Sequence, residues 1–223
     1  MVITIDGPVA AGKTTVARLL AERLGLTLLD TGAIYRCVAL ASHRQGVSWE
    51  DELEVARIAA ALNVRFQVEG EVNRVLLDNE EVTEAIRSPE MSQGASIVSA
   101  LPAVRAALLD LQRDVASGAD VIAEGRDTGT VVFPGAEVKV FLQASPEVRA
   151  RRRRRELQTK GIDEDLSVVL MSLNDRDARD SNRPVAPLTP AADAILIDAT
   201  DKSAQEVVTE ILDHVRMHAN DKP

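Results

Sequence analysis

One short stretch, residues 7–15, constrains the fold of this chain more than any other. It reads GPVAAGKTT, and the spacing G-x-x-x-x-G-K-[ST] is satisfied by Gly7, Gly12, Lys13 and Thr14. Residues 2–6 are mostly apolar and β-branched, as expected of a buried strand, and an apolar stripe at helical spacing follows the stretch. A glycine-rich turn between a strand and a helix is the setting of a phosphate-binding loop.

Each residue type in this loop has a task in binding a polyphosphate. The glycines let backbone N–H groups turn toward a phosphate, and the helix N-terminus adds partial positive charge. The Lys13 side chain can reach β- and γ-phosphates, and the Thr14 hydroxyl can ligate Mg²⁺. We expect Lys13 to lie on an exposed loop. The alternative is a strand-to-helix turn with no ligand, which the agreement of pattern and context disfavours.

Composition limits the kinds of partner this protein can have. The 223 residues suit one domain, or one domain with an insertion. Aromatic residues make up only 2%, so the core must come from Leu, Val, Ile and Ala. The net charge of −9 argues against a general nucleic-acid or anionic-membrane surface. A polyphosphate site must therefore rely on local clusters of arginine.

The cysteine and histidine content excludes two further kinds of site. The single cysteine, Cys37, allows no internal disulfide, and we expect a small core residue there. The three histidines, His43, His214 and His218, have no cysteine partners at zinc spacing. The chain shows no basic, apolar leader and no run long enough to span a bilayer, so we expect a soluble, cytoplasmic protein.

A second polar segment follows a second predicted strand. Residues 26–29 form that strand, and the segment DTGAIYR comes at its carboxyl end, where open α/β sheets bind ligands. Asp30 or Thr31 can cap a helix that runs to about residue 45. Arg36 lies about one turn into this helix and can meet an anion. A solvated helix residue is the alternative for Arg36.

The middle of the chain departs from the α/β alternation. A helix is expected over about residues 49–62, and residues 64–70 and 72–77 then alternate apolar and polar positions, with a turn at 69–71. This pattern predicts an antiparallel hairpin, and residues 78–81 predict another turn. A hairpin does not belong to a wound parallel sheet, so we expect residues 63–93 to form an inserted subdomain. The core domain would then comprise residues 1–62 and 94–223.

The alternation resumes with a helix that begins at Pro102 and ends near Gly118. Residues 121–123 form a central strand, and a charged, glycine-rich loop with Arg126 and Asp127 follows it. Residues 138–143 form the next strand.

A run of arginines comes next, on a helix that begins near Ser145. It contains Arg149 and five consecutive arginines over residues 151–155. Five consecutive residues point all around a helix, so they cannot all serve one site. We favour a mobile lid over about residues 151–161 that supplies one or two arginines to transferring phosphates. A solvated basic surface and a nucleic-acid contact are the alternatives.

A helix from about residue 164 carries a second basic cluster. Val169, Leu173, Arg176 and Asp180 are spaced four, three and four residues apart, which places them on one face. Arg183 follows, and Pro184 ends the helix. An Arg176–Asp180 ion pair and a ligand-binding role both remain open on spacing alone. A last strand over residues 194–198 and a final helix with a capping box at 203–206 complete the chain.

Taken together, five segments of this sequence resemble the bacterial cytidylate kinase family. They read GPVAAGKTT, DTGAIYR, EGRDTGTVVFP, ASPEVRARRR and RDARDSNRPVAPL, and the resemblance extends over essentially the whole chain, including the hairpin. It implies an α/β P-loop kinase fold, with a five-stranded parallel sheet of order 2-3-1-4-5 flanked by helices, a small antiparallel β insertion and a short helical lid. It also implies an enzyme of pyrimidine nucleotide metabolism that transfers the γ-phosphoryl group of ATP to CMP or dCMP with Mg²⁺.

The resemblance also implies roles for individual residues. Residues implied to bind ATP are Gly7, Pro8, Val9, Ala10, Ala11, Gly12, Lys13, Thr14 and Thr15, with Thr14 also at the Mg²⁺. Contacts to the sugar and phosphate of CMP are implied for Thr31, Arg36, Arg126, Arg176, Asp180 and Arg183. Contacts to the cytosine are implied for Ser96, Arg105 and Asp127. The catalytic set is Lys13, Arg126, Arg153 and Arg176. The loop interior, residues 8–11, departs from relatives that carry Ser-Gly there, and Thr31 replaces a serine found in some relatives.

Three other functions are alternatives to this one. A different small-molecule P-loop kinase, such as a shikimate or dephospho-coenzyme A kinase, would share the core but not the hairpin. A GTPase would normally show D-x-x-G and N-K-x-D motifs, and the sequence contains neither. Salt-sensitive binding of RNA or DNA would favour a nucleic-acid-binding protein. We expect ATP and CMP or dCMP as the partners, no nucleic acid or membrane, and a monomer.

Overall fold

The computed structural model describes residues 1–69 and 72–220 of the chain. By internal contacts the chain divides into two compact units. Unit 1 comprises residues 1–27 and 119–223, and unit 2 comprises residues 28–118. The phosphate-binding loop belongs to unit 1, and so do the helix that carries the arginines of residues 151–155 and the helix that carries Arg176. The hairpin belongs to unit 2.

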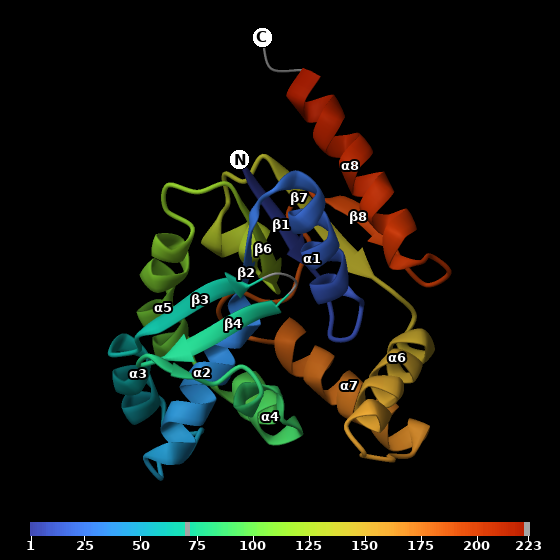
Figure 1. The fold of residues 1–223 in the computed structure, drawn as a ribbon. Helices are drawn as coiled ribbons and strands as arrows, with labels where there is room; N and C mark the ends of the chain where they lie inside the picture. Colours follow the sequence, from blue (N-terminus) through green and yellow to red (C-terminus); the bar gives the residue numbers. More distant parts are fainter. Residues whose placement is uncertain (70–71, 221–223) are drawn as a thin grey trace. The chain divides into compact units, whose positions relative to one another are not determined.

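A parallel sheet of five strands, in the order β2-β6-β1-β7-β8, forms the larger sheet of the fold (Figure 1). The strands are β1 (Val2–Asp6), β2 (Thr27–Asp30), β6 (Val121–Gly125), β7 (Val138–Gln143) and β8 (Ile195–Asp198). Ile3 pairs with Ile122 of β6 on one side and with Val138 of β7 on the other. When the strands of the smaller sheet are left out of the numbering, this is the order 2-3-1-4-5, so the predicted topology is confirmed.

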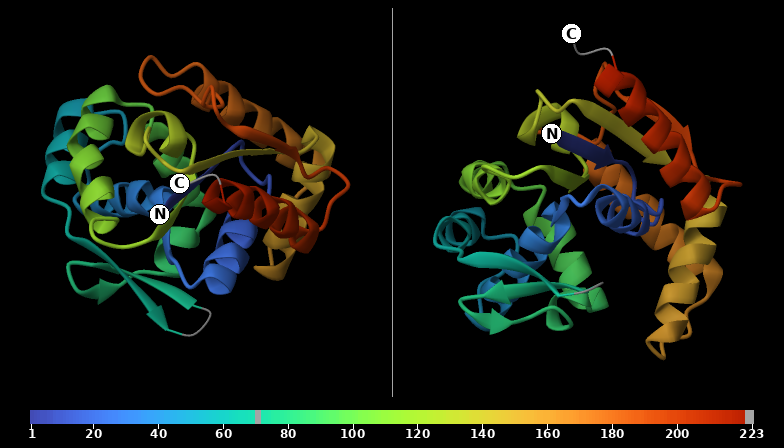
Figure 2. Two further views of the ribbon diagram at one scale, coloured as in Figure 1. Left: turned by 90° about the horizontal axis from the view of Figure 1, so that it is seen from above. Right: turned by 45° about the horizontal axis from the view of Figure 1, so that its top comes forward.

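Burial explains why these sequences form central strands. All five residues of β6 are buried, as are four of the five in β1, because strands of a parallel sheet are covered on both faces. The described α-helices of unit 1 are α1 (Lys13–Leu24), α6 (Pro146–Thr159), α7 (Leu166–Ser181) and α8 (Ala204–Asn220), and the π-helix η2 (Thr128–Val132) follows β6. Helix α1 contacts α8 and β6, and α6 lies beside α7 (Figure 2).

Unit 2 contains the smaller, antiparallel sheet, in the order β3-β4-β5. Its elements are α2 (Thr31–Arg44), α3 (Glu52–Ala60), β3 (Val64–Glu69), β4 (Val72–Leu77), β5 (Glu80–Glu81), the 3₁₀ helix η1 (Ala85–Arg87), α4 (Pro89–Val98) and α5 (Pro102–Val115). The register Val64↔Leu77 confirms the predicted hairpin. The turn predicted at 69–71 falls largely on residues 70 and 71, which lie outside the described residues.

Two predicted boundaries in unit 2 were wrong. Asp78 and Asn79 have positive φ values of 52° and 69° and form a two-residue turn, but Glu80 and Glu81 already pair with β4. Helix α3 is shorter than the predicted 49–62, because the Asp51 carboxylate caps it by accepting a hydrogen bond from Glu54 N–H at 3.2 Å. The predicted insertion, residues 63–93, includes the small sheet and the first half of α4, and its limits stay a prediction.

A hydrophobic cluster in unit 2 joins α2 to the hairpin. Cys37 lies in this cluster with Leu40, Val75, Leu77 and Met91, which confirms it as a core residue. Burial raises the pKa of the Cys37 thiol to about 12. Among the described residues no single helix is long and apolar enough to cross a membrane; α4 and α5, bent by 102°, pass only as a pair, by length and composition.

Candidate phosphate-binding site

The phosphate-binding loop begins after β1 at Gly7, where any side chain would displace the backbone. Gly7 has a φ of 149°, and a Cβ added to it would lie 2.0 Å from the backbone oxygen of Leu142 in β7. Gly12, with a φ of 105°, precedes the first residue of α1. Between them, Ala10 adopts the left-handed conformation with a φ of 59°. The loop is therefore a tightly bent arch pressed against the neighbouring strand.

Lys13 is buried, so the expectation of an exposed lysine was wrong. It is the first residue of α1, is 6% exposed, and donates from Nζ to the Pro8 carbonyl at 2.7 Å. The loop wraps over the side chain, which the motif spacing alone could not reveal. Burial, helped by the charge of Arg126, lowers the pKa of Lys13 to about 7, although Glu124 and Asp6 oppose the shift. A bound phosphate would favour the charged form.

Glu124 completes the set of polar groups beside the loop, and the sequence analysis assigned it no role. It is buried in β6, and its Oε2 accepts a hydrogen bond from Thr14 Oγ1 at 3.0 Å. A glutamate that follows the apolar residues 121–123 in a buried strand was the available signal. Hydroxyl and carboxylate oxygens are ligands that suit Mg²⁺. In the described parts of the chain no group of three or more His, Cys, Asp or Glu could hold a metal, so phosphates and water would complete the coordination.

Asp6 is a second buried carboxylate whose role the sequence did not indicate. It accepts hydrogen bonds from Thr128 N–H at 2.9 Å, from the Thr128 hydroxyl at 2.8 Å and from Gly129 N–H at 2.7 Å. Burial raises the pKa of Asp6, although these hydrogen bonds oppose the increase. A Cβ on Gly129 would lie 2.8 Å from Thr4 Oγ1. Asp6 therefore ties the turn that follows Arg126 and Asp127 to the strand that leads into the phosphate-binding loop.

The second basic cluster forms around Asp180 of α7. Its Oδ2 accepts from Arg126 Nε at 2.8 Å, and its backbone oxygen accepts from Arg183 Nε at 3.1 Å. Burial alone would raise the pKa of Asp180, but the charges of Arg126, Arg176 and Arg183 outweigh it and lower the pKa. Asp180 forms an ion pair with Arg126, from a different segment of the chain, and the charge of Arg176 also acts on it, so the Arg176–Asp180 pair and a ligand-binding role of Arg176 both remain open. Arg126, Arg176, Asp180 and Arg183 are thus brought together in unit 1.

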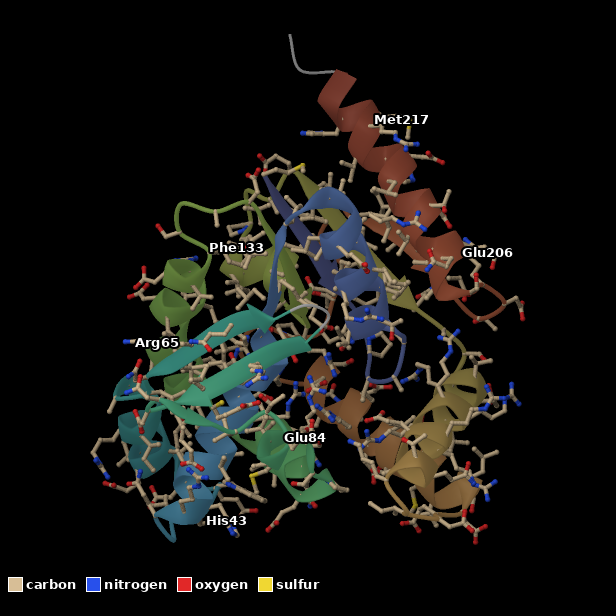
Figure 3. All side chains as sticks on the ribbon, viewed as in Figure 1. His43, Arg65, Glu84, Phe133, Glu206 and Met217 are labelled. Carbon is tan, nitrogen blue, oxygen red and sulfur yellow. The ribbon has the colours of Figure 1, made fainter. Side chains whose placement is uncertain are left out.

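The arginines of α6 have different partners, and Figure 3 shows nitrogen-tipped side chains on more than one side of this helix. Arg149 Nη1 donates to Val9 O at 3.1 Å, and Arg152 Nη1 donates to Ala11 O at 3.0 Å, so two of the guanidinium groups contact the phosphate-binding loop itself. Arg153, the residue placed in the catalytic set, pairs with Glu156 at 2.7 Å. Its catalytic role stays a prediction.

Of the other predicted CMP-binding residues, Asp127 is buried in unit 1, and the rest lie in unit 2. Asp30 caps α2 by accepting from Ala33 N–H at 3.0 Å, and its other oxygen accepts from Arg36 Nη2 at 2.6 Å. Arg105 is buried, with Nη1 donating to Ser99 O at 3.2 Å and its guanidinium 5.4 Å from the Tyr35 ring centroid. Thr31 and Ser96 are also buried. A solvated helix residue, the alternative for Arg36, does not describe this side chain, which is 21% exposed.

The sheet order and the loop between β1 and α1 define the class of this protein, a P-loop kinase. A cytidylate kinase family model matches residues 3–217. The cytidylate kinase of Pasteurella multocida is 48% identical over 223 residues, which covers 100% of this chain and 98% of that protein. The cytidylate kinase of Vibrio cholerae is 50% identical over 214 residues, covering 96% of this chain and 95% of its own. The chain belongs to the cytidylate kinase family.

One solved structure adds a comparison of the fold alone. An uncharacterized protein from Eubacterium ventriosum superposes with a TM-score of 0.51 at 12% sequence identity, covering 97% of this chain and 98% of that one. Identity this low carries no information on substrates.

Proposed function

We propose that this protein transfers the γ-phosphoryl group of ATP to CMP or dCMP and releases ADP with CDP or dCDP. The observation that carries the proposal is the cytidylate kinase match over residues 3–217, which includes every polar residue of the candidate site. The buried Lys13 and the exposed Thr14 at the start of α1 support it, since both lie where a P-loop enzyme binds phosphates and metal.

The chemistry needs no nucleophile from the protein. A phosphate oxygen of CMP attacks the γ-phosphorus in line, the bond to the bridging oxygen breaks, and ADP leaves. The chain's contribution is positioning and neutralisation of charge. We assign neutralisation of the transferring phosphates to Lys13, Arg126, Arg153 and Arg176, and binding of the ATP phosphates to residues 7–15.

Mg²⁺ is the metal that this donor set suits best. When bound, it neutralises charge on the β- and γ-phosphates of ATP. The Thr14 hydroxyl would be its protein ligand, and Glu124, 3.0 Å from that hydroxyl, would orient the hydroxyl or a metal-bound water. ATP itself brings the remaining oxygens.

The acceptor base would be chosen by three residues, Ser96, Arg105 and Asp127. Cytosine carries an amine beside an unprotonated ring nitrogen, whereas uracil carries a carbonyl beside an N–H. Asp127, when ionised, only accepts hydrogen bonds, Arg105 only donates, and a serine hydroxyl does both. All three side chains are buried, where a mismatched pair of polar groups is costly. The sugar and phosphate of CMP are assigned to Thr31, Arg36, Arg126, Arg176, Asp180 and Arg183.

The proposal also covers the location, the oligomeric state and the partners of the enzyme. We assign it to the cytoplasm as a monomer, without nucleic acid or membrane as partners, in keeping with its net charge of −9. Closure of residues 63–93 and of the lid at 151–161 over the substrates would exclude water from the transfer.

A panel of acceptors tests the function. ADP release is followed with ATP, Mg²⁺ and each nucleoside monophosphate in turn, and shikimate and dephospho-coenzyme A serve as acceptors of the alternative kinases. We expect rapid ADP release with CMP and dCMP. Faster release with a purine monophosphate, shikimate or dephospho-coenzyme A would overturn the assignment, and salt-sensitive RNA binding without kinase activity would favour the nucleic-acid alternative.

A further inference from the structure

Two charged side chains that carry no assigned role, Arg149 and Asp177, form hydrogen bonds with the backbone of one residue of the phosphate-binding loop. Val9 N–H donates to Asp177 Oδ1 at 3.2 Å, and Val9 O accepts from Arg149 Nη1 at 3.1 Å. Arg149 also forms an ion pair with the other carboxylate oxygen of Asp177. We propose that Arg149 and Asp177 are positioning residues that hold the loop in its ATP-binding shape. The inference rests on the proposed function, because it takes this loop as the ATP site.

The ion pair joins a buried guanidinium to a partly buried carboxylate. The Arg149 side chain is 7% exposed and that of Asp177 is 18% exposed, so water screens their charges little. Arg149 Nε also donates to Ala144 O at 3.1 Å, which anchors the guanidinium to the segment between β7 and α6. With its donors fixed at Ala144, Val9 and Asp177, Arg149 cannot turn away without breaking several contacts at once.

The loop has a strained backbone that such contacts would stabilise. Ala10, next to Val9, has a φ of 59°, a conformation that a residue with a Cβ adopts only at a cost in free energy. The side chains of Val9 and Ala10 also pack against a cluster of buried residues on α6 and α7. The cluster comprises Ala150, Leu157, Val169 and Leu173. Apolar packing below the loop and the ion pair on its backbone therefore select the same strained arch.

The shape of this arch decides where its backbone N–H groups point. A phosphate is bound by several N–H donors at once, so a displacement of about 1 Å can cost about 10²-fold in rate. Arg152 holds the same loop at Ala11 O, at 3.0 Å, which places a second arginine of α6 on it. Loss of the Arg149–Asp177 ion pair should therefore weaken binding of ATP and leave the residues assigned to cytosine in place.

Two conservative substitutions test the role of the Arg149–Asp177 ion pair, and two substitutions in another ion pair serve as controls. Asp177→Asn keeps only one acceptor oxygen, so it cannot accept from Val9 N–H and from Arg149 at the same time. Arg149→Lys keeps the charge but loses the fork of donors. The control variants, Arg216→Gln and Asp213→Asn, remove an exposed ion pair on α8, far along the chain from every residue of the proposed site, with side chains 72% and 60% exposed. Circular dichroism verifies folding, and calorimetry gives the dissociation constants of ATP and CMP beside the steady-state KM values.

The expected result is a selective loss of ATP binding. Both test variants should raise the Kd and KM for ATP by about 10-fold or more, with CMP values within about threefold. The control variants should match wild type. ATP values that stay within about twofold of wild type, or ATP and CMP values that rise together, would overturn the inference.

Arg149→Lys carries the test if Asp177→Asn does not fold. Wild-type protein that binds no ATP would overturn the proposed function and this inference with it. Wild-type protein that binds ATP, beside variants that bind it equally well, would overturn this inference alone.

Discussion

Lys13, the proposed phosphate ligand, is a lysine buried among other charges. It lies within the electrostatic reach of two carboxylates, Asp6 and Glu124, and of two arginines, Arg126 and Arg176. Desolvation and the arginines disfavour its charge in the free protein. The negative charge of the ATP polyphosphate would favour protonated Lys13. The resulting ion pair would form at the phosphates that take part in the reaction.

Replacement of Lys13 by a residue that fills the same space should therefore reduce activity strongly without destabilising the fold. Lys13→Met keeps the apolar stem that the buried site surrounds, whereas Lys13→Ala leaves a cavity. We expect Lys13→Met to reduce kcat by roughly 10²–10⁴, as for other lost transition-state charges, with a melting temperature at or above that of wild type. Steady-state kinetics and thermal denaturation check both parts. Turnover close to wild type would remove Lys13 from the catalytic set.

The same residue gives stability a dependence on pH. The folded pKa of about 7 lies below the ordinary value of 10.5, so between these values the unfolded chain binds a proton that the folded protein has lost. The free energy of unfolding should thus rise with pH in this window, by up to about 1.4 kcal/mol per pH unit relative to Lys13→Met. Urea denaturation of both proteins without nucleotide, between about pH 7 and 9, measures the difference. A difference that is flat or falls with pH would contradict the assigned shift.

Base choice is a further property at the scale of single residues. Asp127→Ala and Arg105→Met each remove one proposed contact to cytosine, so kcat/KM for CMP should fall sharply. The CMP-to-UMP ratio, expected to be roughly 10² or more in wild type, should narrow, with KM for ATP within a few-fold. Parallel assays with CMP and UMP measure the ratio. If both variants keep the wild-type ratio, these residues do not read the base.

Among the elements, the strand β1, the loop and helix α1 form the unit that the sequence predicted best. The apolar strand, the glycine spacing and the helical stripe agree with one another, and such local consistency is what a sequence reveals most readily. Strand β5 was missed because two residues carry no periodicity. Asp6 and the Arg149–Asp177 pair could not be found because each contacts a partner far along the chain, such as Val9 at 168 residues from Asp177. Glu124 was overlooked, although a glutamate after the apolar residues 121–123 of a buried strand was a signal for it.

The close approach of the loop to β7 makes a prediction for this element. Gly7→Ala would place a Cβ 2.0 Å from Leu142 O, at a φ of 149°, so the backbone must move. Gly25→Ala, at the end of α1, meets nothing within 4 Å and bears only the cost of a φ of 67°. We expect Gly25→Ala to lose about 1 kcal/mol of unfolding free energy, and Gly7→Ala to lose several-fold more together with ATP binding. Equal losses in urea denaturation would contradict the geometry of the loop.

At the scale of the whole molecule, membership of the cytidylate kinase family agrees with the residue-level chemistry of both units. The family match extends over residues 3–217, and the P. multocida relative aligns over 100% of this chain. The motifs DTGAIYR and RDARDSNRPVAPL carried this identification in the sequence, since the phosphate-binding loop alone is common to many kinases. The structure adds the groups around the motifs, which position the loop and its lysine.

Closure over substrates is the motion we expect of the molecule. Hydrogen exchange is compared for the protein alone and with CMP plus an unreactive ATP analogue. Residues 63–93 and 151–161 should exchange more slowly with both ligands present, because closure excludes water from the transfer. Equal exchange in the two states would count against the lid and the closing insertion.

The central claim is that a phosphoryl group passes from ATP to a cytidine monophosphate. The most direct measurement follows the terminal phosphate of γ-labelled ATP, with Mg²⁺ and CMP, by chromatography of the products. The account predicts that the label appears in CDP at the rate at which ADP forms, and that UMP takes it up roughly 10²-fold more slowly. Label released mainly as inorganic phosphate, or transferred equally well to UMP, would contradict it.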